Sequence, residues 1–272
     1  MLTVSTVNVN GIRAAYRRGM GDWLAARDPQ ILLLQEVRAN DEILADHLGP
    51  DWHVVHRAGA IKGRSGVAVA ARTPLVAVRQ GLGAPEEETE YQIGRWVEAD
   101  VDLPGSAPDH STKTLTVVST YIHSGTAGTP SMDDKYAFLD KVTARLGELM
   151  ASGRHVVVGG DINIAHHEVD IKNWKGNRSS AGFLPAERAY LDAWLEQGWA
   201  DLGRALGGDG PGPYTWWSWR GKAYDNDAGW RIDYQYATPD LAARAQSAHV
   251  ERAPTYAERF SDHAPLTVHY AI

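Results

Sequence analysis

Residues 155–163 constrain this chain more than any other segment, because a run of valines is followed by two glycines and two polar side chains. The valines are typical of a strand buried on both faces. Gly159 and Gly160 leave room for a tight bend or for a ligand close to the backbone. Asp161 and Asn163 share a side-chain direction if the chain stays extended. The segment predicts a carboxylate and an amide at a sheet edge, where α/β enzymes commonly hold reactive groups, with a plain turn as the alternative.

Length and composition limit the class of protein. The chain has 272 residues and no linker-like segment, so we expect one domain over residues 1–272. It contains no cysteine, which excludes disulfides and thiolate metal sites. No signal peptide or membrane-spanning run is evident, so we expect a cytoplasmic protein without membrane contact, associated with the nucleoid if the source is bacterial. A net charge of −7 argues against a generally basic nucleic-acid binder but leaves room for a local basic groove.

Apolar periodicity predicts many strands and few helices. Alternation over 2–8 predicts an edge or half-buried strand, and a polar hairpin loop is expected over 104–112. Helical spacing is found over 14–26, 41–48, 132–150 and 187–197. Further strands are expected over 30–34, 52–56, 65–71, 75–80, 95–101, 114–121, 155–159, 232–237, 248–251 and 264–270. This order predicts an α/β fold in which two packed mixed β-sheets are flanked by helices, a four-layer α/β sandwich.

Polar side chains gather where these apolar runs end or begin. They are Asn8, Asn10, Glu36, Tyr121, Asp161, Asn163, Asp233, Asp262 and His263. If the strand ends converge, the result is one site with several carboxylates, one histidine, one tyrosine and several amides. Carboxylate and amide oxygens without cysteine suit Mg²⁺ or Mn²⁺, so Glu36 is the best candidate metal ligand, with Asn10 and Asp262 as neighbours. A surface charge or a helix-start acid is the plainer interpretation of Glu36.

The other polar residues also allow two interpretations each. Asp233 could fix the tautomer of His263, and the pair could act as a base or contact a phosphate, or His263 could simply cap the last strand. Asp161 could orient or deprotonate a water molecule, and Asn163 could hold a phosphoryl oxygen. Tyr121 could donate to a developing phosphate charge, although packing is the commoner fate of a tyrosine. Together these groups describe metal-assisted hydrolysis of a phosphoester.

The same residues resemble a known family. The blocks that carry the resemblance are 7–13, 34–36, 159–163, 229–234 and 261–263. In this order they resemble the exonuclease III class of abasic-site (AP) endonucleases, within the endonuclease/exonuclease/phosphatase superfamily. The segment 170–183, followed by Glu187 and Arg188, is similar to the abasic-endonuclease branch and assigns Asn177 to substrate binding. Tyr214 to Trp217 also fits that branch.

The resemblance implies a role for each candidate. Glu36 would bind Mg²⁺ (Mn²⁺ can substitute), with Asn10 and Asp262 close by. The implied catalytic residues are Asp161, Asn163, His263, Asp233, Tyr121 and Asn8. Asp161 would activate or position the attacking water, and Tyr121 would contact the phosphate or serve as a phenolate base. Trp216, Trp230 and Ile232 would line a pocket for an extruded, baseless deoxyribose.

Two positions depart from the family pattern. His123 stands where the family usually has proline, and Ser124 is a shorter phosphate contact than asparagine. Arg220 stands where some members carry an apolar wedge, and it could enter the duplex or contact a phosphate. Candidate DNA contacts are Arg13, Arg17, Arg18, Lys62, Arg64, Lys172, Lys175, Arg178, Arg220 and Lys222, each of which could also be a solvated surface charge.

The expected function is a Mg²⁺-dependent DNA repair nuclease. It would hydrolyse the phosphodiester 5′ to abasic sites in duplex DNA and carry 3′→5′ exonuclease and 3′-end-trimming activity, acting as a monomer on DNA with abasic sites or blocked 3′ ends. Three alternatives remain. The chain could mainly be a 3′-phosphatase and exonuclease with weak incision, a non-catalytic DNA-damage binder, or a small-molecule or lipid phosphodiesterase.

Overall fold

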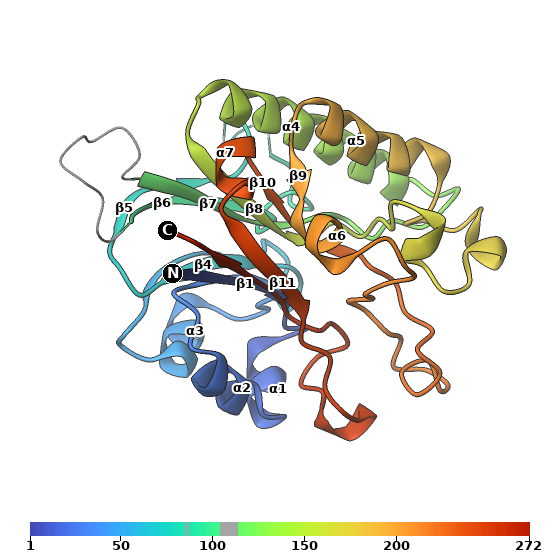
Figure 1. Ribbon diagram of the computed structural model, residues 1–272, viewed down its shortest axis with the longest axis horizontal. Coiled ribbons are helices and arrows are strands. Elements are labelled where there is room, and N and C mark those ends of the chain that lie inside the picture. Colours follow the sequence, from blue (N-terminus) through green and yellow to red (C-terminus); the bar gives the residue numbers. More distant parts are fainter. Residues whose placement is uncertain (85, 87, 104–113) are drawn as a thin grey trace.

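Two six-stranded β-sheets lie face to face, with helices on both outer surfaces (Figure 1). This computed structural model describes residues 1–84, 86, 88–103 and 114–272. Both sheets mix parallel and antiparallel pairs. The predicted fold class is confirmed. Among the described residues, no helix has the length and apolar character needed to cross a membrane.

The first sheet has the order β11-β12-β1-β2-β4-β3. Its strands are β1 (Leu2–Asn8), β2 (Ile31–Gln35), β3 (His53–Arg57), β4 (Val67–Ala71), β11 (Ala245–Val250) and β12 (Leu266–Tyr270). β1 is parallel to β2 and antiparallel to β12, and every residue of β1 is buried. The prediction of an edge or half-buried strand over 2–8 is therefore wrong, because β1 is covered on both faces and its polar residues bond to neighbouring strands, as Ser5 does to Thr267 and Thr6 to Gln35.

The second sheet has the order β5-β6-β7-β8-β10-β9. Its strands are β5 (Leu75–Gln80), β6 (Trp96–Asp102), β7 (Thr114–Tyr121), β8 (His155–Asp161), β9 (Ala200–Asp201) and β10 (Asp233–Ala237). β7 and β8 are parallel, and β10 runs antiparallel to β8. In this register Tyr121 is opposite Asp161, and Asp161 is opposite Asp233. The pairing of three strands thus gathers three predicted site residues.

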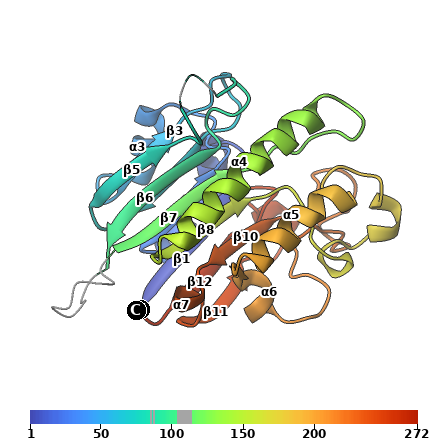
Figure 2. The same cartoon turned by 90° about the horizontal axis from the view of Figure 1, so that it is seen from above.

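Helices cover the outer faces of both sheets. The longest, α4 (Ser131–Ala151), and α5 (Pro185–Glu196) lie side by side across the second sheet (Figure 2). The first sheet is covered by α1 (Ile12–Arg17), α2 (Met20–Arg27) and α3 (Asp41–Leu48) (Figure 1). Shorter pieces are α6 (Leu202–Gly207), α7 (Pro239–Ala242) and the 3₁₀ turns η3 (Glu168–Asp170), η4 (Trp174–Asn177) and η5 (Tyr256–Glu258). Each long helix buries an apolar stripe, which is why it packs flat on its sheet.

The structure differs from the predicted elements in two helical regions and one short strand. The helix predicted over 14–26 is two helices, because Gly19 adopts a left-handed conformation (φ +99°) between α1 and α2. The short elements α6 and β9 were not predicted, since a run of six and a run of two residues carry little periodic signal. The hairpin loop predicted over 104–112 lies outside the described residues.

The two glycines of the opening segment serve packing inside the fold. Both lie within β8, so the expectation of a bend or a ligand there is wrong, as is the turn alternative. A Cβ atom on Gly159 would come within 2.6 Å of Leu33 in the facing sheet. A Cβ atom on Gly160 would collide with the carbonyl oxygen of Thr120 in β7. Glycine is required here because neighbouring chain segments, and not a ligand, approach the backbone.

Candidate active site

The predicted site residues meet at one end of the two sheets. The carboxyl ends of β1, β2, β7 and β8 lie there beside the amino ends of the antiparallel strands β10 and β12. They surround a cavity of about 420 Å³. Its lining comprises Asn10, Glu36, Arg38, Tyr121, Ser124, Gly125, Asp161, Asn163, Ala181, Gly182, Trp216, Trp230, Ile232, Asp262 and His263. Segments far apart in sequence therefore form one polar cavity with an aromatic wall.

Asn8 connects the two sheets at the floor of this cavity. Its amide nitrogen donates to Glu36 Oε1 (2.8 Å) on the first sheet and to Asp161 Oδ2 (2.9 Å) on the second. Its own oxygen accepts from the backbone of Asn10 (3.0 Å), and its carbonyl accepts from Ser261 Oγ (2.7 Å). Asn8 is fully buried, so its orientation is fixed by these bonds. It holds two carboxylates together without adding a charge.

His263 lies between two carboxylates, and we call Asp161, Asp233 and His263 the histidine cluster. The Nδ1 atom of His263 is 2.8 Å from Asp233 Oδ2, and Nε2 is 3.7 Å from Asp161 Oδ2. Burial disfavours the charged imidazole, but Asp233 and Asp161 outweigh it and raise the pKa of His263 to about 10. Burial, with Asp233 and Glu36 nearby, raises the pKa of Asp161 to about 8 even though the charge of His263 opposes this.

Asp262 is held in a different way. Its Oδ1 accepts from the side-chain amide of Asn10 (2.8 Å), and its Oδ2 accepts from the indole of Trp216 (3.1 Å). Burial opposes ionisation, but the charge of His263 and these hydrogen bonds prevail and lower the pKa of Asp262. Asp262 is therefore a carboxylate over the physiological pH range, at the wall of the cavity.

Two sets of side chains have the donor atoms for a divalent cation. The ligand atoms of the histidine cluster lie within 4.8 Å of one another, but one of them is an imidazole nitrogen, which a hard cation does not favour. Glu36, Asn10 and Asp262 instead offer only oxygen donors and line the open cavity. Hard cations such as Mg²⁺ prefer oxygen ligands with room for retained water. The chemistry of the donors fits the second set, which contains the metal ligands expected from the sequence, and the structure adds an ion pair between Glu36 and Arg38.

Asn163 enters the site by a backbone turn that the sequence did not predict. The strand ends at Asp161, and Asn163 adopts a left-handed conformation (φ +54°). Its backbone N–H donates to Asp161 Oδ1 (2.9 Å), and its side-chain amide donates to Asp161 Oδ2 (3.1 Å) and to the carbonyl of Ile122 (2.9 Å). Asn10 and Glu36 also have positive φ angles. Such conformations concentrate at functional sites because the surroundings must hold them.

Tyr121 lines the cavity at the end of β7. The guanidinium of Arg95 lies 4.7 Å from the centre of its ring and donates to its carbonyl oxygen (3.2 Å). Burial and the charges of Glu36 and Asp161 raise the pKa of Tyr121 well above 10, against the effect of Arg95. The phenol therefore keeps its proton near neutral pH, which disfavours the phenolate-base alternative.

Most predicted substrate-binding residues line the cavity, and two lie elsewhere. Trp216 and Trp230 form an edge-to-face pair with ring centres 6.1 Å apart. Asn177 is outside the lining, because its amide bonds to the carbonyl of Asn173 (2.9 Å) and its oxygen accepts from Ser180. Arg220 is exposed on the loop between the two tryptophans and also lies outside. Asn8 and Asp233 lie behind the lining. Asn8 bonds to Asp161 and Asp233 bonds to His263, so each orients a residue that lines the cavity.

The tryptophans divide between this cavity and the core. Trp194 and Trp199 are buried in the cluster beneath α4 and α5, and Trp217 is buried in a separate cluster with Tyr224. Trp216 and Trp230, which the resemblance assigns to a pocket, are the two tryptophans that line the cavity. Trp194, Trp199 and Trp217 therefore contribute to packing and lie outside the lining of the cavity.

Sequence reasoning missed two cations beside the site. Arg38 lines the cavity and pairs with Glu36, and the stacking of Arg95 on Tyr121 has no local sequence signal. Arg38 could have been found, because it lies two residues after a candidate metal ligand. It also borders a neighbouring cavity of about 540 Å³, whose other basic lining residues are Arg13, Lys62 and Arg64. These three were predicted as DNA contacts.

Comparison with known proteins decides the family. The profile described as the Endonuclease/Exonuclease/phosphatase family matches residues 5–263. The chain belongs to this family. It is 32% identical over 275 residues to the DNA repair nuclease APEX1 of Danio rerio, covering 100% of this chain and 83% of that protein. It is 32% identical over 260 residues to the exodeoxyribonuclease of Bacillus subtilis, covering 95% of each.

Solved structures of family members have the same fold. An AP endonuclease from Archaeoglobus fulgidus superposes with a TM-score of 0.85 at 27% identity, covering 100% of both chains. A 3′ phosphatase from Neisseria, bound to a product DNA hairpin, gives 0.85 at 25% identity, also over 100% of both chains. The predicted resemblance to exonuclease III-class AP endonucleases is confirmed, and the chain is a hydrolase of this nuclease class.

Proposed function

We propose that this protein is a Mg²⁺-dependent DNA repair nuclease that hydrolyses the phosphodiester 5′ to an abasic site, leaving a 3′-hydroxyl and a 5′-deoxyribose phosphate. The observation that carries the proposal is the single cavity in which the histidine cluster faces an aromatic wall. We further propose that the protein has 3′→5′ exonuclease and 3′-end-trimming activity. The relatives named as a DNA repair nuclease and as an exodeoxyribonuclease support the repair activity and the exonuclease activity, respectively.

The histidine cluster supplies the acid–base chemistry. Asp161 is positioned by Asn8 and takes a proton from the attacking water, for which its raised pKa suits it. His263, oriented by Asp233, stays charged and contacts the scissile phosphate, where charge increases in the transition state. Tyr121 donates its phenolic hydrogen to the same phosphate. Both hydrogens of the Asn163 amide are taken by Asp161 and Ile122, so Asn163 acts by holding Asp161 in place.

Glu36, Asn10 and Asp262 would hold the cation, with Mn²⁺ as a possible substitute. When bound, the cation polarises the phosphoryl oxygens and stabilises negative charge there. Replacing Glu36 by glutamine should raise the Mg²⁺ concentration needed for half-maximal activity by about 10- to 100-fold. Titration of Asp233→Asn is the matched control, because a histidine-cluster metal would make that variant the one whose Mg²⁺ requirement rises.

The aromatic wall selects the substrate. Trp216, Trp230 and Ile232 line the cavity together with Ala181 and Gly182, and in this proposal they receive a sugar that has lost its base. A residue that has lost its base costs little to extrude from the duplex, and a normal nucleotide does not fit a tight pocket. The wall therefore favours an abasic site over an intact one.

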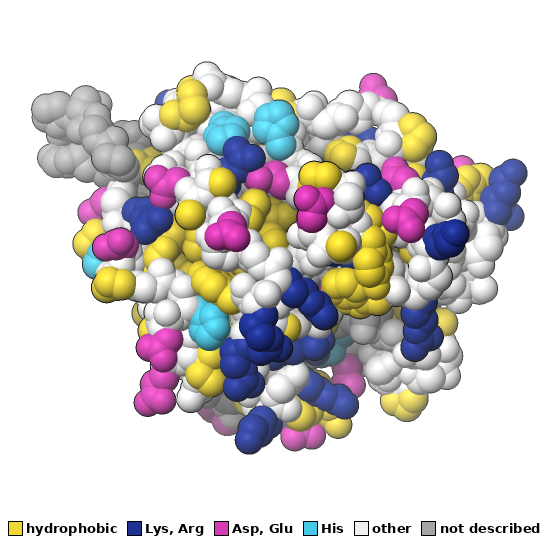
Figure 3. All heavy atoms as spheres, turned by 90° about the horizontal axis from the view of Figure 1, so that it is seen from below, with side chains coloured by type: hydrophobic (Ala, Val, Ile, Leu, Met, Phe, Trp, Pro, Cys, Tyr) yellow, Lys and Arg dark blue, Asp and Glu magenta, His cyan; other side chains and the backbone are white. Residues whose placement is uncertain are grey.

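Local positive charge supplies DNA affinity on an acidic protein. All ten lysines and arginines predicted as DNA contacts are exposed. Figure 3 shows Lys and Arg side chains gathered on the face that includes α1 and α2. Phosphate contacts by these residues release counterions, so affinity should fall steeply with salt. Three of the ten also line the second cavity next to the candidate metal ligands.

The deciding experiment is incision of a duplex with one internal abasic analogue, with Mg²⁺ and with EDTA. We expect cleavage 5′ to the lesion that EDTA abolishes and added Mg²⁺ restores. Activity that survives EDTA would contradict the proposed metal dependence. Cleavage of an intact duplex at the same rate would contradict the proposed role of the aromatic wall in substrate selection.

A second candidate function is a 3′-phosphatase and exonuclease with weak incision. The similarity to the Neisseria 3′ phosphatase favours it, as do the changes at the cavity rim. There Ser124 lines the cavity and His123 bonds to the carbonyl of Tyr91 (2.9 Å), where the family pattern has proline. A nicked duplex with a 3′-phosphate distinguishes the two, because strong phosphate release without incision would favour the second. Non-catalytic damage binding is disfavoured, because Glu36 and the histidine cluster are intact.

A further inference from the structure

A buried ion pair lies directly behind the cavity and outside its lining. Lys135 Nζ on α4 is 2.5 Å from Glu187 Oε1 on α5, and both side chains have no exposed surface. Burying two charges is unfavourable unless each is fully hydrogen-bonded, and a well-packed apolar pair is often as stable. The pair is therefore poorly explained by stability alone, so its remaining partners matter.

All three hydrogens of the Lys135 ammonium have acceptors. Besides Glu187, they are the carbonyl oxygens of Asn163 (2.9 Å) and Ser124 (3.2 Å). Asn163 is the left-handed residue whose amide contacts Asp161. Ser124 belongs to the loop that follows Tyr121. One ammonium thus connects two active-site segments that have no regular secondary structure of their own.

The carboxylate of Glu187 holds a third segment. It accepts from the backbone N–H of Gly182 (2.7 Å to Oε2) and of Leu184 (3.0 Å). Gly182 lines the cavity at a positive φ of 88°, and a Cβ there would lie 3.0 Å from both the Asn163 carbonyl and the Trp230 ring. The backbone of Gly182 is therefore pressed between a catalytic loop and the aromatic wall.

We propose that Lys135 and Glu187 are positioning residues that join the loops at Ser124, Asn163 and Gly182 into one rigid unit. The inference rests on the proposed function, because it assigns these loops to phosphate and sugar contacts. Neither residue contacts the substrate. Their effect is to fix the distance between the phosphate-binding side of the cavity and its aromatic wall.

Lys135 and Glu187 make connections between the three loops that an apolar pair cannot make. Each of the three loops is anchored to a different element, and a displacement of about 1 Å in an active site can lower the rate about 100-fold. Backbone carbonyls such as those of Asn163 and Ser124 can be held only by a donor. An apolar side chain at position 135 would fill the space without holding them.

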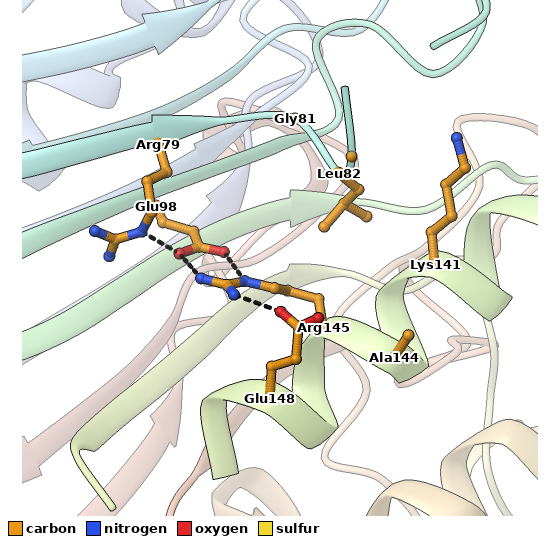
Figure 4. Close-up of a pocket in the computed structure, with 9 residues that line it drawn as sticks. Arg79, Gly81, Leu82, Glu98, Lys141, Ala144, Arg145 and Glu148 are labelled. Atoms are coloured by element: carbon orange, nitrogen blue, oxygen red, sulfur yellow. Dashed lines mark hydrogen bonds and ion pairs between the residues drawn. The ribbon is translucent and has the colours of Figure 1, made fainter. Parts of the chain in front are cut away.

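A second charged network on the same helix provides the control. Arg145 of α4 pairs with Glu98 of β6 (2.7 Å) and with Glu148, and Arg79 of β5 also pairs with Glu98 (Figure 4). These residues line a different cavity, which includes none of the proposed catalytic residues. Arg145→Met therefore removes a connection between α4 and the sheet without altering the three loops.

The test compares wild-type protein, Lys135→Met/Glu187→Gln and Arg145→Met. The double variant removes both buried charges, which avoids leaving one charge unpaired, and the amide oxygen introduced at position 187 can still accept from Gly182. We expect kcat for abasic incision to fall about 10- to 100-fold with KM within about threefold. Amide hydrogen exchange should accelerate in residues 122–125, 163–165 and 180–184. Arg145→Met should keep the wild-type kcat and the wild-type hydrogen exchange in these three segments, even if its melting temperature falls.

Wild-type kcat in the double variant, or an equal loss in Arg145→Met, would overturn the inference. If wild-type protein cleaves no abasic duplex, the proposed function fails by itself. Hydrogen exchange then still decides the positioning role, because unchanged exchange in the three loops of the double variant contradicts it.

Discussion

Two buried charged clusters contain residues only two positions apart in the chain, Arg231 and Asp233, and behave in opposite ways. The histidine cluster contains Asp233, and Arg231 belongs to what we call the arginine cluster, with Asp170, Asp201 and Arg204. Arg231 donates to Asp170 (2.7 Å) and pairs with Asp201 (2.8 Å), so two acids balance two bases. The histidine cluster has two acids and one base, and Asp233 Oδ1 lacks a hydrogen-bond partner among the described residues.

The same residue type therefore ionises differently in the two clusters. Burial opposes ionisation of both acids. At Asp170 the charge and hydrogen bonds of Arg231 prevail and lower the pKa to about 2. At Asp161 burial prevails, with the charge of Asp233, and raises the pKa to about 8. Balanced charge makes the arginine cluster structural, whereas unbalanced charge leaves a proton in the histidine cluster that can move near neutral pH.

The largest expected effect is on catalysis. Asp161→Asn should lower kcat for incision by about 100- to 10,000-fold, because the residue that accepts the proton is removed. Its stability should be unchanged or higher, because a repulsion with Asp233 disappears. Single-turnover incision and urea denaturation measure the two. A large loss of stability would show that the histidine cluster is structural after all.

The arginine cluster should show the reverse pattern. Asp170→Asn should lower the free energy of unfolding by about 3–5 kcal/mol, because it leaves buried arginine charge without its main partner. Folded protein at low temperature should retain kcat within a few-fold. Equal stability of this variant and the wild type in urea would contradict the comparison.

Of these two clusters, only the arginine cluster should lose stabilisation in acid. The pKa of Asp170 lies below its unfolded value, so its stabilisation is present above about pH 4 and is lost as the pH falls towards 2. The contribution is about 2 kcal/mol. When the free energy of unfolding is measured against pH, the wild type should lose stability between about pH 4 and pH 2, and we call this part of the curve the acid limb. Asp170→Asn should flatten the acid limb. Asp161→Asn should leave the limb unchanged, because a raised pKa provides no charge stabilisation for acid to remove.

The smallest effect is expected at the edge of the arginine cluster. Arg204 also pairs with Asp170, but its side chain is 16% exposed, against 1% for Arg231. Arg204→Met should cost about 1 kcal/mol, because water can replace part of the lost interaction. Denaturation midpoints of Arg204→Met and Arg231→Met give the comparison. Similar losses would mean that burial does not set the contribution of each arginine.

Much of the fold was predictable because it depends on local patterns. The helix over 41–48 and the strands over 75–80 and 114–121 match the structure, since periodicity and end signals agree there. Burial of β1 was not predictable, because its polar residues are satisfied by partners from other strands. The catalytic interpretation of the site residues, the single domain and the monomeric state stay predictions.

The sequence by itself determined the residue types of the site, their order, and the family to which they belong. It could not determine that β10 runs antiparallel to β8 and β12 antiparallel to β1, which brings Asp233 and His263 to the end where Asn8 and Asp161 lie. Nor could it separate Arg231 from Asp233 in function, or connect Lys135 to Asn163. Charge balance and hydrogen-bond partners are properties of neighbours in space, so only the tertiary structure decided which buried charges stabilise the fold and which are free to react.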